Sequence, residues 1–116
     1  MKRALIIPAE GMPSTLMVEN TFDTIRDAVG GCFDCVRSKS FHGYVNDTGL
    51  IDGLPFNPIA SVVFGQVICG DAILFGSFNA KGVYDGEEHA IDPAIIAGVK
   101  QQWFLFKTNS DAGVKL

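Results

Sequence analysis

The apolar positions along the chain alternate, or run without interruption, in five segments, as they do in β-strands. These segments are residues 3–8, 14–19, 32–37, 41–46 and 71–78. Ala4–Ile7 and Ala72–Phe75 are apolar on both faces, which predicts strands that are covered on both sides. A turn at residues 10–13 separates the first two strands, so we expect these two strands to pair as a hairpin.

Two other segments have the apolar spacing of amphipathic helices. The first is residues 21–29, which follow Asn20 as a cap and end at Gly30-Gly31. The second begins after Asp92, which can cap it, and is expected to run from Pro93 to about Trp103.

The segments between these elements are less regular. Residues 59–64 fit a short helix or a strand, and Pro58 at a possible first helical position favours the helix. Residues 79–82 read as a turn and residues 83–84 as the start of a short strand, and an acidic loop follows at 85–89.

This order of elements predicts an α+β fold. We expect a single small domain with a mixed or antiparallel sheet of four to six strands, one short helix and one C-terminal helix, in a β-grasp-like arrangement. A chain of 116 residues can bury a core of its own. We place the domain at residues 1–107 and a frayed, polar C-terminal tail at residues 108–116.

The most specific pattern is the stretch YVNDTGLIDGLPFN, residues 44–57. It combines turn-forming Asn, Asp and Gly residues with prolines that exclude regular structure. In one interpretation, which turn chemistry favours, these residues only shape the loop and Asn57 caps a turn. In the other, the loop binds a ligand or partner. The candidate binding residues are Asn46, Gly49, Gly53, Leu54, Pro55 and Asn57.

The same residues resemble the motif of domain of unknown function 3846. Its members are small proteins or domains found largely in actinobacteria, their phages and other mobile elements. The resemblance covers Lys2 to about Gly76 and implies an N-terminal strand, a short helix and strands leading into the VN-x-x-G…GLP-x-N segment. The family has no established catalytic residues, so the resemblance implies none here.

Composition and charge exclude several classes of function. The net charge of −4 argues against a general nucleic-acid surface, which needs clustered Lys and Arg. No apolar run approaches the roughly 18 residues of a transmembrane helix. The apolar segment at the start ends at Pro8, too early for a signal peptide. We therefore expect a cytoplasmic protein without a nucleic-acid or membrane partner.

The residue types that carry catalysis are sparse. Cys32 and Cys35 form a C-x-x-C pair, but residues three apart on a strand point to opposite faces, so we expect neither a metal site nor a redox site. His42 and His89 are far apart in the sequence, and the motifs of hydrolases and nucleotide-binding loops are absent. These features favour a non-enzymatic role without a cofactor.

We therefore expect an accessory protein, encoded by a phage or mobile element, that binds a host protein or other host macromolecule through a sheet edge or through the loop at residues 44–57. The alternative is a small-ligand protein that sequesters a nucleotide, with Arg37 and Lys81 as charge partners. The run Trp103–Phe106 either packs into the core, which we favour, or mediates self-association into a homo-oligomer.

Overall fold

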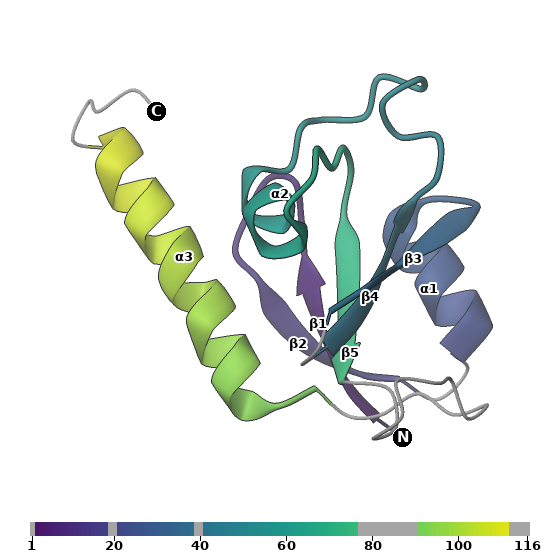
Figure 1. Ribbon diagram of the computed structural model, residues 1–116, viewed down its shortest axis with the longest axis horizontal. Coiled ribbons are helices and arrows are strands. Elements are labelled where there is room, and N and C mark those ends of the chain that lie inside the picture. The colour runs from purple at the N-terminus through teal and green to yellow at the C-terminus, as the bar shows by residue number, and fades with distance from the viewer. Residues whose placement is uncertain (1, 19–20, 39–40, 77–90, 112–116) are drawn as a thin grey trace.

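A computed structural model of the chain has one β-sheet between two layers of helices (Figure 1). The structure describes residues 2–18, 21–38, 41–76 and 91–111. The elements in chain order are β1 (Lys2–Ile7), β2 (Ser14–Val18), α1 (Thr21–Val29), β3 (Phe33–Arg37), β4 (Phe41–Asn46), α2 (Pro58–Phe64), β5 (Ala72–Gly76) and α3 (Pro93–Asp111). The predicted α+β class is confirmed, with two short helices in place of one.

The five strands have the order β2-β1-β5-β4-β3, and every neighbouring pair is antiparallel. The predicted β1–β2 hairpin forms, with Lys2 opposite Val18. The last strand that the structure describes, β5, lies between β1 and β4, with Leu74 opposite Leu5 and Ile73 opposite Tyr44. The central position of β1 and β5 agrees with their uninterrupted apolar sequences.

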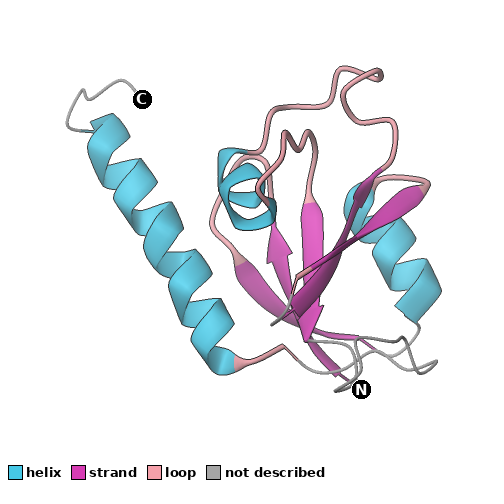
Figure 2. Ribbon diagram, in the orientation of Figure 1, coloured by secondary structure: helices cyan, strands magenta, loops and turns pink. Residues whose placement is uncertain are grey.

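Each face of the sheet has its own apolar core, because successive side chains of a strand point to opposite faces. Figure 2 shows α1 on one side of the sheet and α2 and α3 on the other. The core beneath α1 contains Ala4, Val18, Ile25, Val29, Tyr44, Ile73 and Phe75. The core beneath α2 and α3 contains Leu5, Ile7, Val45, Ile59, Ala60, Ile68, Ala72, Leu74, Ile91 and Val99. The sheet is thus covered on both faces.

A glycine in β4 makes room for α2. A Cβ atom at Gly43 would lie 2.5 Å from Cζ of Phe64 and 2.9 Å from the carbonyl oxygen of Ile73. The ring of Phe64 therefore sits directly over the backbone of β4, close to Phe41, whose ring centroid is 5.9 Å away. The helix predicted for residues 59–64 is confirmed as part of α2, and its packing depends on the close approach of Phe64 to Gly43.

Helix α1 buries Ile25 and Val29, as the spacing predicts. Phe22, expected on the same face, is mostly exposed and contacts the edge of the Phe33 ring at 5.5 Å. The helix ends as predicted, because the N–H groups of Gly30 and Gly31 both donate to the carbonyl of Arg26 and both glycines have positive φ.

The C-terminal helix α3 begins as predicted. The Asp92 carboxylate accepts a hydrogen bond of 2.8 Å from the N–H of Ala94, so Asp92 caps a helix whose first residue is Pro93. The expected end near Trp103 is wrong, because the helix continues to Asp111. No glycine or proline occurs between Phe104 and Asp111 to stop it, so residues 108–111 belong to the helix; the rest of the predicted tail, residues 112–116, lies outside the described residues.

The expectation that Trp103–Phe106 packs as core is also wrong for most of the run. Trp103 is half-buried against the core, but Phe104, Leu105 and Phe106 are exposed. Four consecutive residues on a helix, each turned about 100° from the last, cover almost the whole circumference. Only one side of α3 faces the sheet, so a run of four large apolar residues must place some of them in solvent.

Some sequence predictions fall outside the described residues. These are the Asn20 cap, the turn at 79–82, the short strand at 83–84 and the acidic loop at 85–89 with His89. Within the described ranges, none of the helices is long and apolar enough to span a membrane. The same ranges contain no group of three or more His, Cys, Asp or Glu side chains placed to hold a metal ion.

Candidate functional site

The predicted motif forms the loop between β4 and α2, at the top of Figure 1. Asn46, the last residue of β4, holds the start of this loop. Its side-chain Nδ2 donates to the carbonyl of Val29 at the end of α1, at 3.0 Å. Its Oδ1 accepts from the backbone N–H of Thr48 at 2.9 Å. Asn46 therefore ties the loop to α1 and fixes its first turn.

The loop backbone is closed by its own hydrogen bonds. The N–H of Asp52 donates to the carbonyl of Thr48 at 2.8 Å, and the N–H of Leu54 donates to the carbonyl of Gly49 at 2.9 Å. The Thr48 hydroxyl donates to the Asp52 carboxylate at 2.7 Å. Gly53 takes a positive φ of 70°, which lets the chain turn back without strain. The loop is consequently an ordered structure of residues 47–54.

Close packing holds this loop against the segment that leads into β5. Gly49 is buried, and a Cβ atom there would lie 2.4 Å from the carbonyl oxygen of Cys69. The Leu54 side chain fills the space over Gly70, where Cδ1 lies 2.9 Å from the position of a Cβ. The N–H of Gly70 donates to the carbonyl of Pro55 at 2.7 Å. Larger side chains at either glycine would separate the two segments.

Asn57 is completely buried and forms the junction between the loop, α2 and the sheet. Its Oδ1 accepts from the N–H of Ala60 at 3.0 Å, which makes it the N-cap of α2. Its Nδ2 donates to the carbonyls of Ile7 at 2.8 Å and of Gly70 at 2.9 Å. All the hydrogen-bonding groups of the side chain bond to protein, so the amide is not presented to a ligand.

The predicted binding residues thus lie together in one loop, and most of them stabilise the loop itself. Asn46 and Asn57 hold its two ends, Gly49 and Leu54 pack it, and Gly53 turns it. Of the six predicted binding residues, only Gly53 and Pro55 are exposed. This geometry supports the interpretation that turn chemistry shapes the loop. A binding role for the loop, and for these six residues, stays a prediction.

Two exposed apolar side chains occupy the tip of this ordered loop. Leu50 is 75% exposed and Ile51 is 86% exposed. Burying one such side chain is worth about 1.5–3 kcal/mol, so leaving two in water forgoes a sizeable stabilisation. In the sequence they are two apolar residues within a stretch of turn-forming residues. The signal that could have singled them out is their position between the turns at 46–49 and 52–53, where no core can cover them.

The histidine and the two cysteines considered in the sequence analysis lie outside this loop. His42 is buried beneath α1, where its Nδ1–H donates to the carbonyl of Gly76 at 2.6 Å and its ring stacks on Phe75 at 5.8 Å. Cys32 and Cys35 are both exposed, Cys35 within β3 and Cys32 just before it. None of these three side chains lines the groove between α2 and α3.

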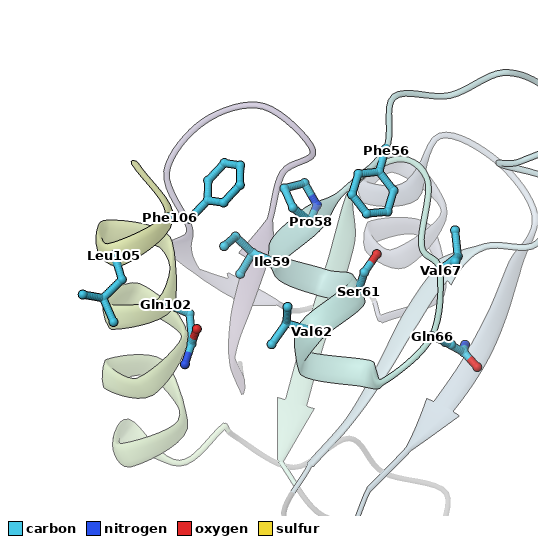
Figure 3. A pocket seen from close by; sticks show the side chains of 10 residues that line it. All are labelled: Phe56, Pro58, Ile59, Ser61, Val62, Gln66, Val67, Gln102, Leu105 and Phe106. Carbon is cyan, nitrogen blue, oxygen red and sulfur yellow. The ribbon is translucent and has the colours of Figure 1, made fainter. Parts of the chain in front are cut away.

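A groove of about 800 Å³ lies between α2 and α3 (Figure 3). We call it the α2–α3 groove. Its lining residues are Phe56, Pro58, Ile59, Ser61, Val62, Gln66, Val67, Gln102, Leu105 and Phe106. None of these side chains carries a charge, and the Ser61 hydroxyl is already bonded to the carbonyl of Asn57 at 2.6 Å. The groove therefore offers an apolar surface with amide groups at its rim.

Comparisons with known proteins bear on the family and not on the activity. The chain matches the family described as "Domain of unknown function (DUF3846)" over residues 1–101. The match extends beyond the resemblance noted in the sequence, which ended near Gly76, and takes in the first half of α3. No curated protein and no solved structure matches the chain. Since the match covers 101 of 116 residues, the chain belongs to the DUF3846 family.

Proposed function

We propose that this protein is a non-enzymatic accessory protein, encoded by a phage or another mobile element, that binds a host protein in the host cytoplasm. The binding surface is the loop tip, which we define as Leu50 and Ile51. The observation that carries the proposal is the combination of two strongly exposed apolar side chains with an ordered loop beneath them. Exposed apolar residues held in a fixed geometry are typical of surfaces that bind other proteins.

The order of the loop is what makes the tip effective. A flexible loop loses conformational entropy when it binds, and this loss offsets much of the gain from burying its side chains. Here the bonds of Asn46, Thr48 and Leu54 already fix the loop backbone in the free protein. Most of the burial of Leu50 and Ile51 is therefore available as binding free energy.

The charges beside the tip indicate the chemistry of the partner. Asp47 and Asp52 are both exposed and flank Leu50 and Ile51 in the sequence. The partner surface that fits is an apolar cleft with Lys or Arg residues at its rim. Such rim charges act mainly on the association rate and on its dependence on salt. We expect the association rate to fall as ionic strength rises.

The proposal is tested by comparing three tagged forms of the protein on host lysate. These are the wild type, Ile51→Asp and the matched control Met17→Asp, whose apolar side chain is also exposed but lies on β2. A host protein should be retained by the wild type and by Met17→Asp and lost with Ile51→Asp. With the purified partner, calorimetry should show binding weakened at least about tenfold, the equivalent of about 1.4 kcal/mol.

Two results would contradict this proposal. One is that no host protein is retained in stoichiometric amounts by the wild type. The other is a retained protein that binds Ile51→Asp and a Leu50→Asp variant as tightly as it binds the wild type. Circular dichroism of each variant should show an intact fold, since neither side chain contributes to the core.

Small-ligand binding is the second candidate, and the volume of the α2–α3 groove favours it, because ligand pockets range over about 300–1,000 Å³. Its lining does not suit a nucleotide, since it supplies no cation for the phosphates. Arg37 belongs to β3 at the edge of the sheet, and Lys81 lies outside the described residues. Native mass spectrometry of the purified protein tests this candidate, which requires a small, discrete mass above that of the chain.

A further inference from the structure

We infer that the face formed by α2 and α3 is the contact surface of a two-fold symmetric homodimer. The α2–α3 groove is the recess on this face. Phe104 and Leu105 form a ridge beside it, which we call the α3 ridge. The loop tip that we propose as the site for a host protein lies on a different segment, so the two inferences can fail separately.

The α2–α3 groove and the α3 ridge lie on the same face and have complementary shapes. Figure 3 shows Phe106 pointing from α3 towards Pro58 and Ile59, whereas Leu105 points away from α2. In a two-fold contact, the same patch of both copies meets, so each copy can place its ridge against the groove of the other. A surface that holds both a projection and a recess is suited to such a self-complementary contact.

The apolar area on this face is close to what a dimer needs. Phe104 is 63% exposed and Leu105 is 48% exposed, and the side chains of Phe56, Val62, Val67 and Phe106 are exposed beside them. Together these six side chains expose roughly 500–700 Å² of apolar surface, given about 150–250 Å² for a large side chain. A stable interface buries about 800 Å² per partner, and the neighbouring glutamines supply polar area for the remainder.

The outer side of α3 is also free of charge. The exposed residues Ala94, Ala97, Gln101, Phe104, Leu105 and Thr108 share this side at helical spacing. The charged residues of the helix before Asp111 are Lys100 and Lys107, and their positions place them to one flank. Each chain has a net charge of −4, so two copies repel weakly overall, but this face brings no like charges into contact.

A second copy fits this face better than a small molecule does. A small ligand in the groove would leave Phe104 in water, because Phe104 does not line the groove and is 63% exposed. A second copy covers both the groove and the ridge. Phe104 and Leu105 also lie beyond the family match, which ends at residue 101, so the contact follows from this chain's own residues and not from its family.

Sedimentation velocity over a dilution series tests the inference. The wild type should sediment at high concentration with twice the chain mass of 12.5 kDa and should dissociate to one chain mass on dilution. Leu105→Asp and Val62→Asp should each be monomeric at concentrations where the wild type is dimeric. Ile51→Asp, whose exposed side chain lies on the loop tip, is the matched control and should remain dimeric.

Three results would overturn the homodimer. They are a wild type that is monomeric at every concentration, a dimer that both Leu105→Asp and Val62→Asp leave intact, and a monomer that carries a small apolar molecule in native mass spectrometry. None of these results affects host-protein binding at the loop tip, which Ile51→Asp tests separately. Loss of dimerisation in Leu105→Asp is informative only with an unchanged circular dichroism spectrum, and Val62→Asp provides the second, independent variant.

Discussion

Replacing Asn57 with alanine removes a side chain that bonds to three separate parts of the fold. Its Oδ1 caps α2 through the N–H of Ala60, and its Nδ2 donates to the carbonyls of Ile7 and Gly70. The residue is completely buried, so water cannot replace these bonds without entering the core. We therefore expect Asn57→Ala to be among the most destabilising single substitutions in this chain.

The magnitude follows from the three bonds. Loss of an N-cap costs about 1 kcal/mol. Each buried carbonyl left without its donor costs about 1–3 kcal/mol. The sum is roughly 3–7 kcal/mol, a large part of the roughly 5–15 kcal/mol that separates folded from unfolded states in most domains. For a chain of this size, the Tm should fall by roughly 10–40 °C, provided that the variant still folds.

Asn57→Asp is the matched variant for this experiment. It keeps the oxygen that caps α2 but places a carboxylate beside two carbonyl oxygens. Burial away from water raises the pKa of the introduced carboxyl, because burial disfavours its charged form. The free energy of unfolding of Asn57→Asp should therefore fall below that of Asn57→Ala by a growing amount as the pH rises through that raised pKa. The difference between the two variants should shrink as the pH falls towards the ordinary Asp pKa of about 3.9, because the neutral acid can donate one hydrogen bond.

Urea unfolding followed by circular dichroism measures both variants against the wild type. Asn46→Ala is the control within the same loop, because Asn46 is only partly buried and should cost about 1 kcal/mol. A loss of less than about 1 kcal/mol for Asn57→Ala would refute the assigned structural role. It would return Asn57 to the candidates for ligand binding.

Two further predictions concern glycines. Gly49→Ala would place a Cβ 2.4 Å from the carbonyl oxygen of Cys69. Its free energy of unfolding should fall by several times the roughly 1–2 kcal/mol expected for Gly53→Ala, where the Cβ has open space but φ is positive. Equal losses of the two variants in urea unfolding would contradict the close contact at Gly49. Gly98 lies inside α3, and a Cβ atom there would meet open space, so Gly98→Ala should raise the free energy of unfolding by about 0.5–1 kcal/mol. A Tm below that of the wild type would contradict the open space at this position.

Local patterns predicted most of the secondary structure. Strand β4 lies at its predicted residues, and α1 ends at its glycines because αL caps depend only on the adjacent sequence. Pro58 and Asn57 start α2 as their types suggest. The insertion of β5 between β1 and β4 could not be predicted, because strand order depends on contacts between distant segments. The length of α3 could not be predicted, because the polar residues after Phe106 fit a continued helix and a frayed end equally well.

The sequence predicts where the candidate loop lies but not which of its side chains are exposed. The motif from Asn46 to Asn57 does mark an ordered loop, but its named residues mostly face inwards. Residue type gives the turn chemistry of Asn and Gly, whereas exposure depends on what the rest of the chain covers. Leu50 and Ile51 therefore read as ordinary apolar residues until the fold shows that nothing in the described structure covers them.

The loop separates the residues that shape it from the residues that can contact a partner. Asn46, Gly49 and Asn57 are bonded or packed within the protein, so changing them alters the loop itself. Leu50 and Ile51 make no contribution to either core, so changing them leaves the fold energetically almost untouched. A loop built in this way can accept other residues at positions 50 and 51 without losing stability. For this reason, unchanged Tm values together with lost binding in the Leu50 and Ile51 variants would be the signature of a binding loop rather than of a purely structural one.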